Sequence, residues 1–491
     1  MKRFILLLFL FVPIVLRADK DPKVVSEVTS QTAEDFYNKG IDAYKKGSYY
    51  ESIELYQKTI DLNPKYDDAY NNMGISYYDL KKYDDAIKCY QKAIDINPKN
   101  AGYYYNMGNS YCILKNQTEA IKNYQKAIDI NPKYDNAYFN MGISYNELKN
   151  YDEAIKCYQK TININPKYHN AYYHLGNAFK DSKKYDEAIK CYKKAIDINP
   201  KNDFALNNLG IVYSDLNNND EAIKYYQKAI EINPKLAGAY NNMGIIYNDL
   251  KNYDEAIKSY KNAIEIDPNY DKAYNNMGNA YNNMKNYDEA IKSYKKAIEI
   301  NPNYKKAYYT MGNTYNALKN YDEAKKSYTG AIKIDNNYLD AIAKRGYVKS
   351  KLNEIDSAII DYDYIINYEE KNKDNFSGLG TTYNNKAYCL VELGKYKEAL
   401  PLANKALELE DKEAYIWNTR GEIYYNLQEY DKSINDMDKA ISIQEYGNSY
   451  YIRGLAKIKK GNKKEACSDL DKAIQLGKDE AIEAKKANCN E

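Results

Sequence analysis

The chain has little of several residue types that carry chemistry in other proteins. Its 491 residues include only 2 His and 1 Trp, and 71 Lys and Arg nearly balance 69 Asp and Glu, for a formal net charge of +2. So few His leave little scope for a His-based metal site or acid–base pair. The near-neutral charge removes the bulk attraction that nucleic acids and anionic membranes offer to a protein. We therefore expect no nucleic-acid partner.

Glycine, proline and cysteine are also scarce. With 22 Gly and 11 Pro the chain is neither collagen-like nor a Gly/Pro-rich disordered protein. The 7 Cys form no CxxC pair, and their odd number argues against a disulfide or metal framework. Cys89, Cys157 and Cys191 share one repeat position with later serines, which indicates packing of a small residue. No nucleophile motif, phosphate loop or zinc helix occurs, so we expect no catalytic residue, no metal site and no cofactor.

Long hydrophobic runs are absent except at the start of the chain. Phe4 to Leu16 is an unbroken apolar run after the basic pair Lys2 and Arg3. This pattern is typical of a secretory signal peptide, here residues 1–18, followed by a polar lead-in at 19–31. The run is shorter than the roughly 17–25 apolar residues of a membrane span. We expect a protein exported to the periplasm or cell envelope, or secreted. The alternative, an uncleaved N-terminal anchor, is the only membrane attachment we expect.

In contrast, the chain is rich in Tyr, with 59 of them, and it is strongly periodic. Gly recurs every 34 residues from Gly40 to Gly346, and eight of the eleven Pro follow the same step from Pro64 to Pro302. The phase continues more loosely beyond Gly346. We count thirteen repeats, from about Thr32 to Gly477.

Each repeat predicts two amphipathic helices. In the second repeat, apolar residues recur at steps of three and four from Asp67 to Leu80, and again from Tyr83 to Ile96. Pro98 ends the second helix, because proline lacks a backbone N–H and clashes with the preceding turn. Gly74 lies in the middle of a helix, where glycine costs about 1 kcal/mol relative to alanine. Its recurrence predicts a close approach between helices.

These positions resemble the tetratricopeptide repeat family. The residues of the second repeat that occupy the family's signature positions are Tyr70, Gly74, Tyr77, Ala86, Tyr90, Ala93 and Pro98. We identify the chain as resembling an exported member of this family, of bacterial type. The resemblance implies an all-α, right-handed superhelical solenoid of about thirteen 34-residue helix-turn-helix repeats. It also implies that the first helix of each repeat lines a concave groove.

The repeats divide into a regular and a divergent set. Residues 32–337 hold nine regular repeats, residues 338–477 hold four divergent ones, and residues 478–491 form a C-terminal cap or tail. An insertion near 372–380 predicts a flexible loop. The divergent repeats carry Arg345, Arg420 and Arg453 beside the repeat position of Gly. Anion binding is possible there, but a packing role is favoured.

Asparagines recur at two positions of the first helix, and we refer to this set as the Asn ladder. One position lies two residues before the repeat Gly, the other directly after it, and in the resembling family both face the groove. An amide offers both a donor and an acceptor, which suits an extended peptide backbone. The alternative is drift on a solvated helix face. The predicted binding residues are Asn72, Asn106, Asn109, Asn140, His174, Asn177, Asn208, Asn242, Asn276, Asn279 and Asn313.

The signal segment, repeats, insertion and tail leave no room for a catalytic domain, so we expect a protein that is not an enzyme. The prediction is a scaffold or adaptor that binds an extended peptide or partner protein in the groove. A structural, self-assembling spacer is one alternative. Another is an accessory for envelope glycans, with Tyr105 and Tyr173 stacking on sugars. A carboxylate or phosphate clamp built on Lys272, Lys306 and Lys344 is less favoured. The sequence sets no oligomeric state.

Overall fold

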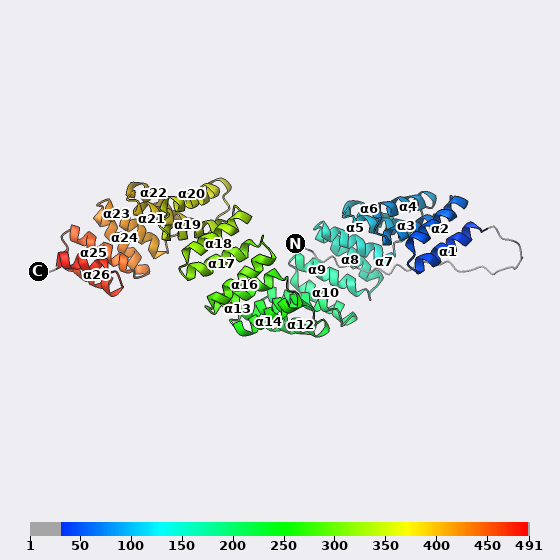
Figure 1. Cartoon of the computed structure of the whole chain (residues 1–491), viewed down its shortest axis with the longest axis horizontal. Helices are drawn as coiled ribbons and strands as arrows, with labels where there is room; N and C mark the ends of the chain where they lie inside the picture. Colours follow the sequence, from blue (N-terminus) through cyan, green and yellow to red (C-terminus); the bar gives the residue numbers. More distant parts are fainter. Residues whose placement is uncertain (1–30, 490–491) are drawn as a thin grey trace. The chain divides into compact units, whose positions relative to one another are not determined.

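The computed structural model describes residues 31–489, and in that part the chain is built from α-helices and turns without a strand (Figure 1). The predicted signal peptide and nearly all of the lead-in lie outside the described residues. Helices α1 to α26 follow one another as thirteen successive pairs, and α27 follows the last pair. This confirms the expected all-α class and the number of helix-turn-helix repeats.

The described chain forms two compact units, which meet within α11 between Val212 and Tyr213. We call the first helix of each pair the A helix and the second the B helix. Unit one contains α1 (Ala33–Lys45), α2 (Tyr49–Leu62), α3 (Asp67–Asp79), α4 (Tyr83–Ile96), α5 (Ala101–Ile113), α6 (Gln117–Ile130), α7 (Asp135–Glu147), α8 (Tyr151–Ile164), α9 (His169–Asp181), α10 (Tyr185–Ile198) and most of α11 (Asp203–Asp215).

Unit two begins with the last residues of α11 and continues to the end of the described chain. Its helices are α12 (Asn219–Ile232), α13 (Ala237–Asp249), α14 (Tyr253–Ile266), α15 (Asp271–Asn283), α16 (Tyr287–Ile300), α17 (Lys305–Ala317), α18 (Tyr321–Ile334), α19 (Leu339–Lys351), α20 (Ile355–Asn372), α21 (Leu379–Glu392), α22 (Tyr396–Leu409), α23 (Ala414–Asn426), α24 (Tyr430–Ile443), α25 (Gly447–Lys459), α26 (Lys463–Gln475) and α27 (Glu480–Cys489).

Each A helix of a regular repeat ends in a left-handed turn. At the end of α3, Lys81 has φ of 61°. The N–H of Lys82 then donates to the carbonyl of Tyr77 at 2.9 Å. This closure satisfies carbonyls that would otherwise be unpaired at the helix end. Gly47, Gly394 and Gly461 take the same turn with positive φ.

The B helices from α2 to α16 each end at Asn-Pro or Asp-Pro, whereas α18 ends at Asp335-Asn336. In α2, the N–H of Asn63 still bonds to the helix, through the carbonyl of Thr59 at 2.8 Å. The Oδ1 of Asn63 accepts the N–H of Lys65 at 3.1 Å. The asparagine thus holds a tight turn across Pro64, as Asx turns do. The chain then enters the next A helix.

The repeat glycines allow a tyrosine to pass directly over the A helix. A Cβ atom at Gly74 would lie 2.7 Å from the ring of Tyr90. Tyr90 comes from the paired B helix and is 1% exposed. Gly142 and Tyr158 repeat the arrangement at the same 2.7 Å. The expected close approach between helices is therefore confirmed.

The A helices of successive repeats also contact one another within each unit. α3 contacts α1 and α5 in unit one, and α15 contacts α13 and α17 in unit two. Each unit therefore has a row of A helices along one side, which we call the A-helix face. Each repeat packs mainly on its neighbours, the general arrangement of solenoid proteins.

The insertion forms a shorter loop than expected. α20 continues to Asn372, and Lys373 closes it with φ of 56°. The next helix, α21, begins at Leu379, so only residues 373–378 lie between helices. α20 has 18 residues where the regular B helix α4 has 14, so the added turn is residues 369–372. Within it Glu369 is buried.

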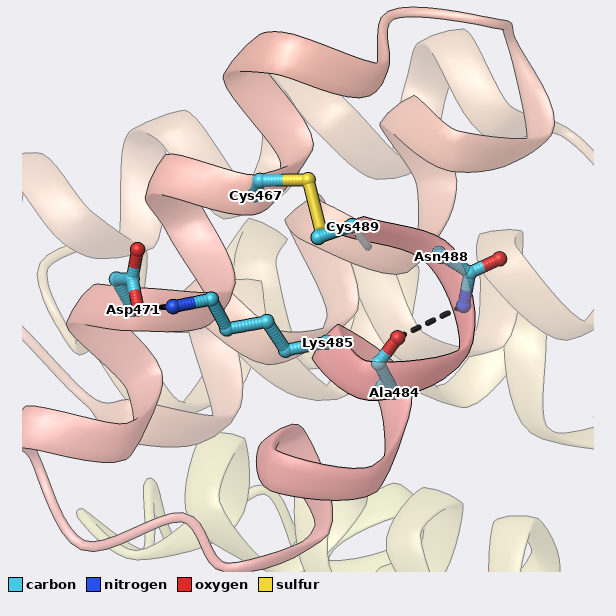
Figure 2. Close-up of a disulfide and its surroundings, with 6 residues drawn as sticks. All are labelled: Cys467, Asp471, Ala484, Lys485, Asn488 and Cys489. Carbon is cyan, nitrogen blue, oxygen red and sulfur yellow. Dashed lines mark hydrogen bonds and ion pairs between the residues drawn. A yellow bond between two sulfur atoms is a disulfide. The ribbon is translucent and has the colours of Figure 1, made fainter. Parts of the chain in front are cut away.

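The expectation of a chain without disulfides is wrong at the C-terminus. Cys467 of α26 and Cys489 of α27 are joined by a disulfide (Figure 2). The two residues are 22 positions apart and belong to no short motif, so only the return of α27 along α26 brings them together. Figure 2 also shows the ion pair between Lys485 and Asp471, which joins the same two helices. Cys89, Cys157 and Cys389 are free and buried, which agrees with a packing role.

Candidate partner-binding face

The Asn ladder lies on the A-helix face, partly or fully covered by neighbouring side chains. None of the eleven predicted residues is exposed. Asn106, Asn109 and Asn140 in unit one are buried. The other members are half-buried.

In six repeats the first ladder position bonds to the repeat before it. Its residue donates to a side chain 35 positions earlier: Asn72 Nδ2 to the Tyr37 hydroxyl at 2.9 Å, and Asn106 Nδ2 to Asn71 Oδ1 at 3.0 Å. The same bond recurs in Asn140 to Tyr105 at 3.1 Å, Asn208 to Tyr173 at 3.3 Å, Asn276 to Asn241 at 3.0 Å and Thr310 to Asn275 at 3.3 Å. The ladder is therefore first a set of bonds between repeats.

The second ladder position receives the hydroxyl of the buried tyrosine that covers the repeat Gly. The Tyr124 hydroxyl donates to Asn109 Oδ1 at 2.9 Å. The same bond joins Tyr192 to Asn177 at 2.7 Å, Tyr294 to Asn279 at 2.9 Å and Tyr328 to Asn313 at 2.8 Å. A phenol in an apolar interior needs such a partner, because an unpaired buried hydroxyl is costly.

Twice, the first ladder position of one repeat bonds to the second ladder position of the repeat before it. Asn140 Nδ2 donates to Asn109 Oδ1 at 2.8 Å, and Asn208 Nδ2 to Asn177 Oδ1 at 2.8 Å. Asn242 differs: its Oδ1 accepts the amide of its neighbour Asn241 at 3.4 Å. The structure thus connects most of the predicted site residues in a network, and leaves Asn242 outside the pattern.

His174 stands in the ladder where the partner 35 residues earlier is Phe139. Phenylalanine accepts no conventional hydrogen bond, and His174 instead packs edge-on against its ring, with centroids 5.3 Å apart. The rings of Tyr158 and Tyr173 are also within 6 Å of the imidazole. Burial lowers the pKa of His174 to about 4, so the imidazole is neutral at physiological pH. Where Phe139 replaces the usual Tyr, His174 replaces the Asn that would have bonded to that hydroxyl.

Three amide oxygens of the first ladder position keep binding capacity, whereas those of Asn72, Asn208 and Asn242 accept the amide of the preceding residue. In the described residues, Asn106, Asn140 and Asn276 use their N–H groups inside the array, and their Oδ1 atoms neither accept a bond there nor count among the enclosed polar atoms without a partner. An amide oxygen accepts N–H groups. The A-helix face thus offers a spaced series of acceptors.

Tyr105 is too well covered to stack on a sugar, as the glycan hypothesis requires. Its side chain is 3% exposed. Its ring lies between Tyr134, at 4.9 Å between centroids, and Tyr124, at 6.0 Å. Burial raises the pKa of the Tyr105 hydroxyl to about 12. This part of the hypothesis is wrong for Tyr105.

The divergent repeats contain ion pairs that sequence reasoning missed. Each Arg beside a repeat Gly binds an Asp sixteen residues later on the paired B helix. Arg345 donates two hydrogen bonds to the carboxylate of Asp361, from Nη2 at 2.7 Å and from Nε at 2.9 Å. Arg420 with Asp436 and Arg453 with Asp469 repeat the bidentate geometry. The common spacing of Arg and Asp is the signal that predicts these pairs. The ion pairs agree with the favoured packing role of the Arg series, because each joins an A helix to its paired B helix.

Residues 31–489 contain neither a candidate metal site nor a candidate membrane-spanning helix. No group of three or more His, Cys, Asp or Glu side chains is placed to hold a metal ion. Over the same range, no helix combines the length and apolar character needed to cross a bilayer.

Comparison with known families matches most of the array. Models of the tetratricopeptide repeat match residues 67–100, 136–168, 204–236 and 271–304, then 89–122, 157–190, 225–258 and 293–326, then 414–446, and finally 380–413 and 447–479. A TPR repeat model matches 42–81, 108–149, 176–217 and 244–285. Together these matches cover residues 42–326 and 380–479 without a gap. The chain belongs to the tetratricopeptide repeat family. Members of this family bind peptides or proteins, and their all-helical arrays are typically non-catalytic scaffolds.

Individual relatives match only part of this TPR array. The BBSome complex member BBS4 of Bos taurus is 32% identical over 92 residues, which is 19% of this chain and 16% of that protein. A crystal structure of MamA is 30% identical and covers 35% of this chain and 93% of its own, with a TM-score of 0.33. The structure of YrrB, a TPR protein with an unusual peptide-binding site, is 27% identical over 38% of this chain and 95% of its own, with a TM-score of 0.32.

Proposed function

We propose that this TPR protein is a non-catalytic adaptor that holds an extended segment of a partner protein along its A-helix face. The Asn ladder carries the recognition. Its side-chain N–H groups fix the repeats to one another, and its free oxygens accept backbone N–H groups of the bound segment. Contacts of this kind read main chain more than side chains, so the face tolerates many partner sequences.

The observation that supports this proposal is that Asn106, Asn140 and Asn276 use their N–H groups within the array and keep their oxygens free. Asn106 and Asn276 each donate to an asparagine of the preceding repeat and leave their oxygen free. An amide that is already held in place loses less conformational entropy on binding than a mobile one. The bonds between repeats therefore preorganise the acceptors.

A conservative exchange separates binding from stability at these positions. Thr310 occupies the same position, and its hydroxyl lies 3.3 Å from Asn275 Oδ1 and within reach of the carbonyls of Lys306 and Ala307. The double change Asn106→Thr and Asn276→Thr then removes two amide oxygens and places a hydroxyl donor near the preceding repeat. We expect weaker capture of the partner, by about thirtyfold if each of the two lost hydrogen bonds is worth about 1 kcal/mol.

The measurement is purification with tagged protein, followed by cross-linking mass spectrometry of the captured partner. The control is Lys92→Ala, on the exposed side of B helix α4. Circular dichroism checks that both variants keep the wild-type helix content. Equal capture by the threonine variant, or cross-links confined to B helices, would contradict the proposal.

We further propose that the mature protein begins at Asp19 and resides outside the cytoplasm, in the periplasm, in the cell envelope or in the medium. The bond between Cys467 and Cys489 supports this location, since disulfides persist chiefly in oxidising compartments. N-terminal sequencing of the protein from its native cells tests the cleavage. A chain that retains Met1 and remains in the cytoplasm would contradict it.

A second function, a self-assembling spacer, has support from one row of exposed side chains. The A helices of unit two end in apolar residues at 34-residue steps, and Leu216, Leu250, Met284 and Leu318 are 43–52% exposed. Light scattering over a concentration series tests this alternative. We expect any assembly to be lost in a variant with Leu250→Glu and Leu318→Glu, because charge opposes apolar association.

A further inference from the structure

Unit two contains a hollow of about 870 Å³ between α17, α18 and α19. It lies beside the B helix α18 and includes no residue of the Asn ladder. Its size is within the range of sites that hold small ligands or several side chains. The hollow is therefore a site separate from the Asn ladder.

Four of the residues that line this hollow depart from the repeat pattern. Lys325, Gly330, Arg345 and Lys349 line it, all of them within α18 and α19. The residues 34 positions earlier are Ile291, Lys296, Met311 and Tyr315. Two apolar side chains and one large aromatic are thus replaced by cations, and one long side chain by glycine. The ring of Tyr308 occupies the space beside Gly330, where a Cβ atom would lie 2.5 Å away.

The lining has more positive than negative charge. Asp361 is shared by Arg345 and Lys349. Lys325 pairs with Glu354 at 2.5 Å, and Lys326 pairs with Glu323. Lys333 is exposed and, in the described chain, makes no ion pair. Five cations therefore face three carboxylates, an excess of two positive charges.

Apolar groups complete the walls. Pro302, Ile334 and the ring of Tyr308 line the same hollow. A phosphate ion alone would leave these groups and most of the volume unused. A peptide that carries both carboxylates and apolar side chains matches the charge, the volume and the walls.

We propose that this hollow, defined by Tyr308, Lys325, Gly330, Lys333, Arg345 and Lys349, binds an acidic segment of a partner protein. This proposal rests on the proposed adaptor function, because that function supplies the protein partner whose segment would bind here. The two surfaces share no residue, so separate variants test them.

The test is fluorescence anisotropy on the full chain with a fluorescein-labelled peptide, Glu-Leu-Glu-Glu-Leu-Glu. Lys333→Glu adds a negative charge at an exposed position, and we expect at least a tenfold loss of affinity. Lys325→Ile with Gly330→Lys restores the residues of the regular repeats and fills the hollow, with the same expected loss. The matched control is Lys292→Ala, because Lys292 holds in α16 the position of Lys326 in α18, outside the hollow. We expect its affinity to stay within about twofold of the wild type.

Further measurements test whether binding depends on the carboxylates of the peptide, whether phosphate is the true ligand, and whether the Asn ladder is involved. A peptide with Gln in place of Glu should lose binding, and salt should weaken the acidic peptide because exposed charges are screened. Equal binding of the Gln peptide, or full binding by both hollow variants, would overturn the proposal. Pyrophosphate that binds as tightly as the peptide and displaces it would assign the site to phosphate instead. The Asn106→Thr, Asn276→Thr variant should bind the acidic peptide normally, so failure of one surface is distinguishable from failure of the other.

Discussion

At the scale of single residues, His174 shows how a repeated network accommodates an exception. The folded protein holds its imidazole neutral with a pKa of about 4, against a value of about 6.5 in the unfolded chain. Between these two values the unfolded state binds a proton that the folded state does not. Stability therefore falls as the pH drops from about 6.5 towards 4. We expect a loss of up to about 3 kcal/mol from this residue, measured by urea unfolding at about pH 7 and about pH 4.5.

The chain supplies the control for this pH effect. Phe139→Tyr with His174→Asn restores the side-chain pair that Tyr105 and Asn140 form in the neighbouring repeats. The double variant has the same carboxylates as the wild type, so the acid sensitivity that remains belongs to other groups. If both proteins lose the same stability between the two pH values, His174 is not the source.

A second residue-scale prediction concerns the repeat glycines. Gly142→Ala places a methyl group 2.7 Å from the buried ring of Tyr158. Although alanine favours the helix by about 1 kcal/mol, overpacking of a filled core costs about 1–3 kcal/mol. We expect net destabilisation in denaturant unfolding. Gly238→Ala is the control, because nothing lies within 4 Å of its added methyl group and only the helix preference remains. A stabilised Gly142→Ala variant would show that Tyr158 moves aside at little cost.

At the scale of elements, the divergent repeats replace an apolar contact by a charged one. Arg420 binds Asp436 through two hydrogen bonds, with both side chains at least four-fifths covered. Asp436→Ser alone leaves the guanidinium without its partner, and we expect a loss of about 3 kcal/mol. Arg420→Met with Asp436→Ser restores the pair of residue types found in regular repeats. We expect the double variant to be close to the wild type in thermal unfolding. Equal losses in both variants would mean that the damage comes from removing the Asp436 side chain, and not from leaving the guanidinium of Arg420 without a partner.

The sequence determines the helices more fully than it determines the roles of their polar side chains. Periodicity alone placed the second helix of repeat two at Tyr83–Ile96, its observed bounds. It also predicted the close approach at Gly74, because mid-helix glycine has no other use. The bonds of Asn140 to Tyr105 and Asn109 were not predicted, since they depend on the stagger between repeats. The disulfide between Cys467 and Cys489 was not predicted either, because it depends on how α27 packs on α26. Whether the ladder binds a partner stays a prediction.

At the scale of the whole molecule, an array in which each repeat packs mainly on its neighbours confines a perturbation to its surroundings. The C-terminus offers a direct test, because the disulfide ties α27 to α26 across 22 residues. A closed loop of that size stabilises by about 3 kcal/mol in the chain-entropy treatment. Cys467→Ser with Cys489→Ser should therefore raise hydrogen exchange in α27 by about 100-fold.

The extent of that change along the chain is the informative measurement. α27 contacts α26 and α25, so we expect the loss of protection to reach these helices and to fade over the next repeat. Exchange in α3 to α8 of unit one should match the wild type. Dithiothreitol added to the wild type provides the control, since it opens the same bond without a substitution. A loss of protection that spreads evenly over the whole chain would show that the array unfolds as one cooperative body, and nearest-neighbour stacking would then be an insufficient account of its stability.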